Sequence, residues 1–199
     1  MKEPFRADME EIRRRAREKM DQGAVTAAYK ADVEQVVAVL NEVLATEIVC
    51  VLRYKNHYYM ARGFHGDAVA DEFLEHAKEE QVHADQVAGR IVQLGGVPNL
   101  DPEGLATRAH AEYKQCADLD EMIREDLAAE RVAIATYSEI IRWLGDDDPT
   151  TRRLMEEILA KEEEHADDLA NLLDSGGPRR HSGAQVQALP LGRSRFSTT

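Results

Sequence analysis

The residues best suited to metal chemistry in this chain form a short motif that occurs twice. Both copies read Glu-x-x-His-Ala-Asp, and their glutamates and histidines are Glu80, His83, Glu162 and His165. Residues three apart on a helix lie about 5–6 Å apart on its surface, so a carboxylate and an imidazole at this spacing can bind the same small ion. One copy is easily explained as a chance pair on a solvated helix. Two copies in one chain indicate a shared metal site.

A further glutamate precedes each copy at a matching distance. Glu47 lies 33 residues before Glu80, and Glu130 lies 32 residues before Glu162. Seven residues after each of these earlier glutamates, two turns along nearly the same helix face, stands a tyrosine: Tyr54 and Tyr137. The pattern predicts two copies of one helical hairpin, offset by 82–83 residues.

Pseudo-symmetric packing of the two hairpins would bring four carboxylates and two imidazoles to the middle of one bundle. Buried like charges without partners are strongly destabilising, and two divalent cations would balance the four negative charges. Carboxylate and imidazole ligands without a thiolate favour iron or manganese over structural zinc and leave positions open for oxygen or peroxide. Di-iron and di-manganese carboxylate bundles use this donor pattern. The predicted ligands are Glu47, Glu80, His83, Glu130, Glu162 and His165.

Helices are the elements predicted to position these residues. Glycine and proline fall almost entirely between the periodic segments, and no stretch alternates as a strand does. The expected class is all-α, with a short charged helix at about 6–20. Four long helices are expected at about 31–62, from Asp67 to Gly95, from Asp118 to Gly145, and from Asp148 to the stretch at 175–178.

Caps and connections indicate how these helices pair. The predicted N-caps are Asp67, Asp118 and Asp148. Glu121 resembles the second member of an acidic capping box, and Pro149 takes a first helical position. Short links make the first and second long helices, and likewise the third and fourth, antiparallel hairpins. The link at 95–116 between the hairpins is long enough for a lengthwise crossover.

Length and composition fit one domain with tails, since 43% of the 199 residues are apolar. The predicted divisions are an N-terminal extension at 1–30, the bundle at 31–174 and a flexible basic tail at 175–199. No stretch approaches the ~18 uncharged apolar residues of a membrane span, and the N-terminus lacks a secretory signal, so cytoplasmic residence is expected. Residues 22–174 carry 14 basic against 32 acidic residues, a charge of −18 that attracts cations.

Taken together, the motifs resemble those of the bacterioferritins over about residues 35–174. The resemblance rests on Glu-x6-Tyr in the first long helix, EEQVHAD in the second, GGVPNL after it, DLAAE in the third and EEEHADDL in the fourth. It implies a ferritin-like four-helix bundle that acts as a ferroxidase. Fe(II) would be oxidised there by O2 or H2O2, and ferric iron would be stored as a mineral inside a hollow homo-oligomeric shell.

The same resemblance implies individual roles for the predicted ligands. The implied terminal ligands are Glu47 and His83 for one iron, and Glu130 and His165 for the other. The implied bridging ligands are Glu80 and Glu162. In the family, the tyrosine that matches Tyr54 hydrogen-bonds near the centre.

Three departures from the family pattern limit what the resemblance implies. Bacterioferritins bind haem through a methionine directly after the glutamate of the first Glu-x-x-His, and that position is Gln81, so haem is not expected. No clear fifth helix follows Asp174, and the N-terminal segment resembles the extensions of twelve-subunit mini-ferritins. A shell of 12 or of 24 subunits stays open.

Other polar residues have plainer interpretations. The positions predicted to lie on the surface are Glu79, Asp85, Glu163, Glu164, Asp167, His57, His65, His76 and His110. Asp126, one turn before Glu130, is either a partner of a ligand histidine or an ordinary acid. Cys50 is expected to be a small buried thiol, badly placed for a disulfide with Cys116. DNA binding by the arginines at 13–17 or in the tail is not expected, because acids interleave them and the body is anionic.

These residues are compatible with three functions. The leading one is a ferroxidase that stores iron. A second is the removal of peroxide, by a mini-ferritin or by a manganese catalase with the same ligands. A third is a non-enzymatic helical adaptor or cargo protein whose tail docks into another assembly. A rubrerythrin is disfavoured, because its electron-transfer domain needs four cysteines and this chain has two.

Overall fold

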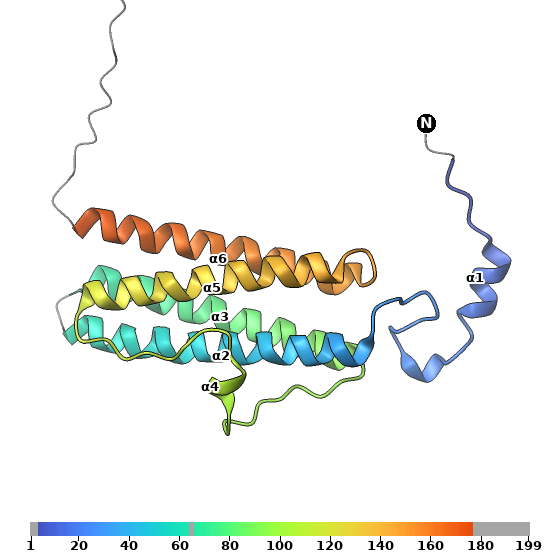
Figure 1. Cartoon of the computed structure of the whole chain (residues 1–199), viewed down its shortest axis with the longest axis horizontal. Coiled ribbons are helices and arrows are strands. Elements are labelled where there is room, and N and C mark those ends of the chain that lie inside the picture. Colours follow the sequence, from blue (N-terminus) through green and yellow to red (C-terminus); the bar gives the residue numbers. More distant parts are fainter. Residues whose placement is uncertain (1–3, 64–65, 177–199) are drawn as a thin grey trace, which may run out of the picture.

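The computed structural model describes residues 4–63 and 66–176 of the chain (Figure 1). No strand occurs in these two stretches, so the predicted all-α class is confirmed. The long helices are α2 (Val33–Gly63), α3 (Asp67–Gln93), α5 (Leu119–Leu144) and α6 (Pro149–Gly176). The short ones are α1 (Met9–Arg15), the 3-10 helix η1 (Met20–Gln22) and α4 (Leu105–Arg108). The predicted tail lies almost wholly outside the described residues, and the division at 30 and 174 stays a prediction.

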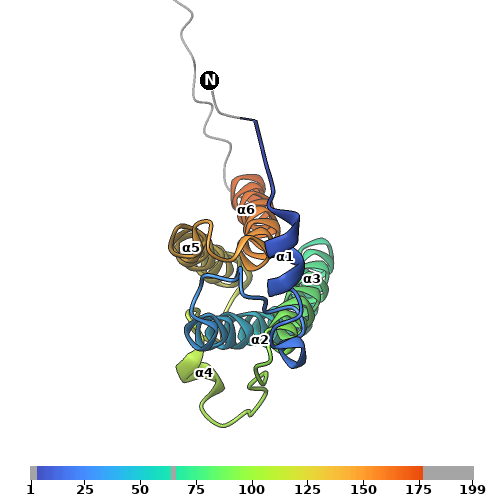
Figure 2. The same cartoon turned by 90° about the vertical axis from the view of Figure 1, so that its right-hand side faces the viewer.

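The four long helices form one bundle of two antiparallel hairpins, α2 with α3 and α5 with α6 (Figures 1 and 2). Residues 94–118 join the hairpins. Figure 1 shows this connection running from the end of α3 back along α2, past α4, to the opposite end of the bundle. The predicted lengthwise crossover is confirmed. It sets α5 antiparallel to α2 and α6 antiparallel to α3, which relates the two copies of the repeat pseudo-symmetrically.

Two of the three predicted helix starts have the expected caps. The Asp118 carboxylate accepts a hydrogen bond from the Glu121 amide at 2.9 Å, and the Asp148 carboxylate accepts one from the Thr151 amide at 2.9 Å. The prediction of Asp67 as an N-cap is wrong, because Asp67 is the first residue of α3 and Gly66 is the cap. A Cβ on Gly66 would lie 3.0 Å from a Leu119 methyl group, so a larger residue at this position would require the Leu119 side chain to shift.

The apolar core of the bundle consists of two separate clusters. One includes Leu40, Leu44, Ile91, Tyr137 and Met155. The other includes Tyr54, Phe73, Met122, Ala129 and Leu169. A polar layer of buried side chains separates the two clusters, and each cluster supplies one of the two repeated tyrosines.

The most apolar helix is α2. Within Val33–Arg62 it has an 18-residue window with a mean hydropathy of 1.8, so the expectation that no stretch approaches a membrane span fails for this helix on length and composition. Of that window, 56% is buried inside the bundle. Burial between the other helices explains this apolar character, because a core helix needs apolar residues around most of its circumference.

Buried contacts fasten the crossover to the bundle. Arg53 forms an ion pair with Asp126 at 2.9 Å and donates to the carbonyl of Glu112 at 2.8 Å. His57 lies 2.8 Å from the same aspartate through Nδ1, and it is fully buried, so the prediction of a surface histidine is wrong. Its neighbours explain this, because the Asp126 carboxylate and the Lys114 carbonyl lie within hydrogen-bond distance of its two ring nitrogens inside the core.

The N-terminal extension contacts the bundle at one end. The Tyr29 hydroxyl donates to Asp148 at 2.8 Å, and Arg90 donates to the same carboxylate at 2.9 Å. Helix α1 lies apart from the four long helices (Figure 1), and none of its residues is buried. It is shorter than the predicted 6–20, since it ends at Arg15, and the chain turns again at Lys19, whose φ is 48°.

Candidate metal centre

Six side chains from all four long helices converge in the polar layer. Their exposed fractions are 5% for His83 and 1% for each of the others. The set is Glu47 on α2, Glu80 and His83 on α3, Glu130 on α5, and Glu162 and His165 on α6. These are the six residues that the repeat predicted as ligands, and the structure brings all of them together.

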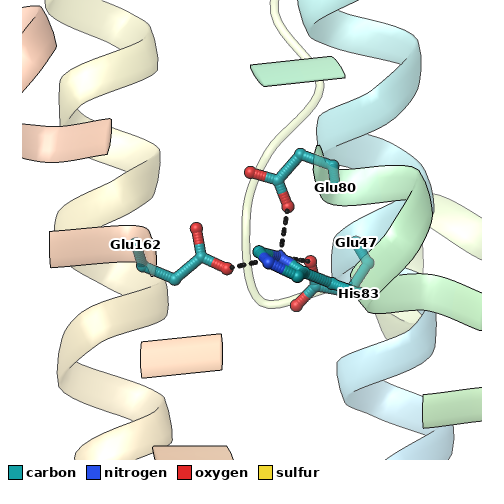
Figure 3. A group of neighbouring side chains, drawn as sticks. All are labelled: Glu47, Glu80, His83 and Glu162. Carbon is teal, nitrogen blue, oxygen red and sulfur yellow. Dashed lines mark ion pairs between the residues drawn. The ribbon is translucent and has the colours of Figure 1, made fainter. Parts of the chain in front are cut away.

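The six side chains form two groups of donor atoms. In each group the donor atoms all lie within 4.8 Å of one another, and the two groups share Glu80 and Glu162. Figure 3 shows the first group, in which the His83 ring faces three glutamates. Its Nδ1 lies 3.2 Å from Glu162 Oε1, 3.4 Å from Glu47 Oε2 and 3.5 Å from Glu80 Oε2.

The second group repeats this arrangement around His165. Its Nδ1 lies 3.3 Å from Glu80 Oε1, 3.4 Å from Glu162 Oε2 and 4.0 Å from Glu130 Oε1. Each of the two groups could hold a metal ion. Each group has one imidazole, one carboxylate of its own and two carboxylates in common with the other.

Most donor atoms of these groups do not form hydrogen bonds with one another, but they could bind metal ions. Both histidine Nδ1 atoms, both Glu162 oxygens and one oxygen each of Glu47 and Glu80 are buried without a hydrogen-bond partner among the described residues. The short contacts therefore lack hydrogen-bond geometry. A buried polar atom without a partner costs about 1–3 kcal/mol, more if charged. Divalent cations would satisfy all of these atoms at once.

The electrostatics of the centre reflect this crowding of carboxylates. Burial, followed by the charge of Glu162, raises the pKa of Glu80 and of Glu130 well above the ordinary value. Burial opposes protonation of the histidines, yet the carboxylates raise the pKa of His83 to about 12 and that of His165 to about 9. A metal ion at either group would compete with protons for the imidazole nitrogen.

The repeated tyrosines support glutamates of the opposite hairpin. The Tyr54 hydroxyl donates to Glu130 Oε1, and the Tyr137 hydroxyl donates to Glu47 Oε1. Both tyrosines are fully buried, and burial raises the pKa of each well above its ordinary value. Each hydroxyl therefore stays protonated and holds one carboxylate oxygen, and for Glu47 the other oxygen, Oε2, faces His83.

Several neighbours of the centre differ from the prediction. Glu79, expected to be solvated, accepts a hydrogen bond from His165 Nε2 at 2.7 Å. His76, expected on the surface, is 1% exposed, and burial lowers its pKa to about 3. Asp126, whose role the sequence left open, contacts His57 and not one of the six predicted ligands. Helical spacing could have predicted the burial of His76, since positions 76, 80 and 83 share one face of α3.

The remaining polar predictions divide between the surface and the interior. Five residues are exposed, as predicted for the four acids: Gln81, Asp85, Glu163, Glu164 and Asp167. His110 is partly buried, because its amide donates to Thr46 Oγ1 at 2.9 Å, and His65 lies outside the described residues. The Cys50 thiol is buried as predicted, and burial and then Glu80 raise its pKa, which places it within electrostatic range of the centre. Cys50 and Cys116 are both free thiols.

A surface hollow leads toward the first donor group. It has a volume of about 360 Å³, lies between α3 and α6, and includes His83 in its lining. Its charged lining residues are Glu79, Glu157 and Lys161. A small ion or an oxidant can therefore reach the edge of the centre without passing through the apolar clusters.

Comparisons with known proteins agree with this architecture. Residues 37–176 match the model of the ferritin-like domain. The bacterioferritin of Brucella melitensis is 32% identical over 143 residues, which cover 70% of this chain and 83% of that protein. The DNA protection during starvation protein of Pyrococcus furiosus is 31% identical over 162 residues, covering 75% of this chain and 82% of that protein.

A solved structure extends the comparison to three dimensions. The dodecameric thioferritin of Bacteroides fragilis, described as a bacterioferritin-related protein, superposes with a TM-score of 0.70 at 34% identity. The match covers 73% of this chain and 88% of that one. With the domain match, the relatives and the fold in agreement, the chain belongs to the ferritin-like family.

Proposed function

We propose that the centre holds two iron ions and that the protein is a ferroxidase. The observation that carries this proposal is the pair of donor groups that share Glu80 and Glu162 and contain buried atoms without partners. The ions would supply one-electron chemistry, because each Fe(II) gives one electron to O2 or H2O2. Manganese fits the same donors.

Each ligand has a role under this proposal. The residues that would hold one ion each are Glu47 with His83, and Glu130 with His165. The residues that would bridge both ions are Glu80 and Glu162. Glu79 accepts the Nε2 proton of His165, which leaves Nδ1 of that ring free to face the ion.

The wider protein would deliver and store the oxidised iron. The net charge of −13 and the two glutamates in the hollow beside His83 attract Fe(II) to the centre. Ferric iron would then collect inside a homo-oligomeric shell of 12 or 24 subunits, in keeping with the dodecameric state of the thioferritin. We assign the protein to the cytoplasm. Haem is not part of the proposal, because Gln81 stands where the haem-binding methionine would be.

A second candidate is protection against peroxide with the same centre. The same carboxylate and imidazole donors would leave coordination positions open for peroxide, which supports this candidate. DNA binding itself is not proposed, because the described body of the chain is strongly acidic. The two candidates differ in whether H2O2 or O2 is the faster oxidant of Fe(II).

Stopped-flow oxidation of Fe(II) by O2 and by H2O2 tests the proposal. Glu80→Ala removes a bridging carboxylate and should abolish rapid oxidation, while far-UV circular dichroism shows that the helices remain. Asp85→Ala, exposed on the same helix, is the matched control and should oxidise Fe(II) at the wild-type rate. Wild-type rates in the Glu80 variant would refute its assignment. Evolution of O2 from H2O2 without ferric product would instead indicate a catalase.

A further inference from the structure

A separate cluster of donor side chains lies beside the candidate metal centre. Glu72 and His76, four residues apart, share one face of α3, and Asp168 stands opposite on α6. His76 Nε2 is 3.4 Å from Glu72 Oε1 and 3.9 Å from Asp168 Oδ2. One donor atom from each of the three residues lies within 4.8 Å of the others. None of them belongs to the six residues of the centre.

The histidine of this cluster distinguishes it from an ordinary group of surface acids. His76 is 1% exposed, and neither of its ring nitrogens has a hydrogen-bond partner among the described residues. Its ring stacks on His165 at 4.1 Å between centroids and meets Tyr54 edge-on at 5.2 Å. These contacts hold the ring with Nε2 directed toward the two carboxylates. A buried imidazole with two unpaired nitrogens is costly unless something binds it.

We propose that Glu72, His76 and Asp168 form a third divalent-cation site, separate from the two-ion centre. Two ligand atoms, each about 2.1 Å from an ion and at a tetrahedral angle, lie roughly 3.4 Å apart, which resembles the observed separations. The two carboxylates balance the charge of one divalent ion. An imidazole with two carboxylates suits Fe²⁺, Mn²⁺, Co²⁺ or Zn²⁺.

Because both acids are partly exposed, an ion at this site could exchange with solvent. The side chains of Glu72 and Asp168 are 37% and 44% exposed, so water can fill the remaining coordination positions. Burial and then Asp168 raise the pKa of Glu72, because the two acids repel each other. A cation between them relieves this repulsion. The buried imidazole supplies the selectivity for transition metals, since Ca²⁺ and Mg²⁺ prefer oxygen ligands.

Counting bound Co²⁺ in the metal-free, full-length protein tests this site. Calorimetric titration and the visible absorption of bound Co²⁺ would be compared for wild type and for Glu72→Gln/Asp168→Asn. Both side chains are more than a third exposed, so the variant should fold, and circular dichroism checks this. The variant should bind one Co²⁺ fewer per chain. Glu75→Gln/Asp167→Asn, with both acids exposed on the same two helices, should bind as many ions as wild type.

The difference between the variant and wild type decides the outcome, whatever the total. If the two-ion centre failed to bind Co²⁺, the total would fall in every protein, but the loss of one ion in the variant would remain. Equal numbers of ions in the folded variant and in wild type would overturn the proposal. His76 would then be a core residue that only packs against His165.

Discussion

Replacing Glu80 by glutamine should have opposite effects on stability in the metal-free and in the metal-loaded protein. Glu80 is 1% exposed, belongs to both donor groups and has a buried oxygen without a partner. In the metal-free protein, Glu80→Gln removes one of four crowded carboxylates. The metal-free variant should therefore be at least as stable as metal-free wild type. With metal, the variant should be the less stable protein, because both ions lose a ligand.

The size of the effect follows from linkage between binding and folding. At a free metal concentration of 100 times the Kd, one bound ion stabilises the folded state by about 2.7 kcal/mol, and two ions by about 5 kcal/mol. In a chain of this length, each kcal/mol raises the Tm by about 2–4 °C. Wild type should therefore gain about 10–20 °C from the two ions of the centre, and Glu80→Gln should gain less than half of that.

Thermal unfolding with and without Mn²⁺, followed by circular dichroism, measures both quantities. Mn²⁺ avoids the oxidation that Fe(II) would undergo during the scan. Asp85→Asn on the exposed face of α3 is the control, and its gain should match that of wild type. A full gain in Glu80→Gln would refute the bridging assignment. The absence of any gain in wild type would refute the site itself.

Four further substitutions test contacts at the centre and elsewhere in the bundle. Tyr54→Phe leaves an oxygen of Glu130 without its donor and should lower the free energy of unfolding by about 1–3 kcal/mol in a urea titration. Burial opposes ionisation of Asp148, but its hydrogen bonds outweigh burial and lower its pKa. The ionised carboxylate therefore stabilises the folded protein above pH 3.8, and this stabilisation is lost as the pH falls through the folded pKa. Asp148→Asn should reduce this loss of stability in acid unfolding. Gly96→Ala should cost about 1–3 kcal/mol of unfolding free energy, whereas Gly89→Ala should stabilise by about 0.5–1 kcal/mol.

Two of these predictions have control substitutions at positions that the structure leaves open. Tyr59 is 71% exposed, so Tyr59→Phe should leave the free energy of unfolding unchanged, and an equal loss in both tyrosine variants would contradict the first prediction. A Cβ on Gly96 would meet Val37 at 2.6 Å, whereas a Cβ on Gly89 meets nothing within 4 Å. Equal effects of alanine at both glycines would mean that the crossover does not pack closely on α2. An unchanged acid-unfolding slope in Asp148→Asn would contradict the linkage.

The sequence repeat predicted the bundle and its central layer because both follow from local rules. Helical periodicity, Pro149 after a capping aspartate and the glycines at helix ends determine where the long helices begin and stop. Two copies of one spacing then place Glu47 and Glu130 at matching depth, since each copy builds the same hairpin. The convergence of the six side chains needed no knowledge beyond this symmetry.

The residues that the prediction missed depend on contacts between helices. Glu79 is one residue before Glu80 and looks solvated along α3, but α6 brings His165 against it. His76 becomes buried because the same ring of α6 covers it. His57 needs Asp126 from α5, 69 residues away. From one sequence alone, we can predict which face of a helix a residue occupies. We cannot predict which residue of another helix lies opposite it.

Anomalous X-ray scattering at the iron edge, from crystals loaded anaerobically with Fe(II), would locate the two proposed ions. We predict two peaks in the polar layer, with Glu80 and Glu162 bonded to both. One peak should also have Glu47 and His83 as ligands, and the other should have Glu130 and His165. A map with no iron among these six side chains, in a protein whose bundle is intact, would contradict this prediction.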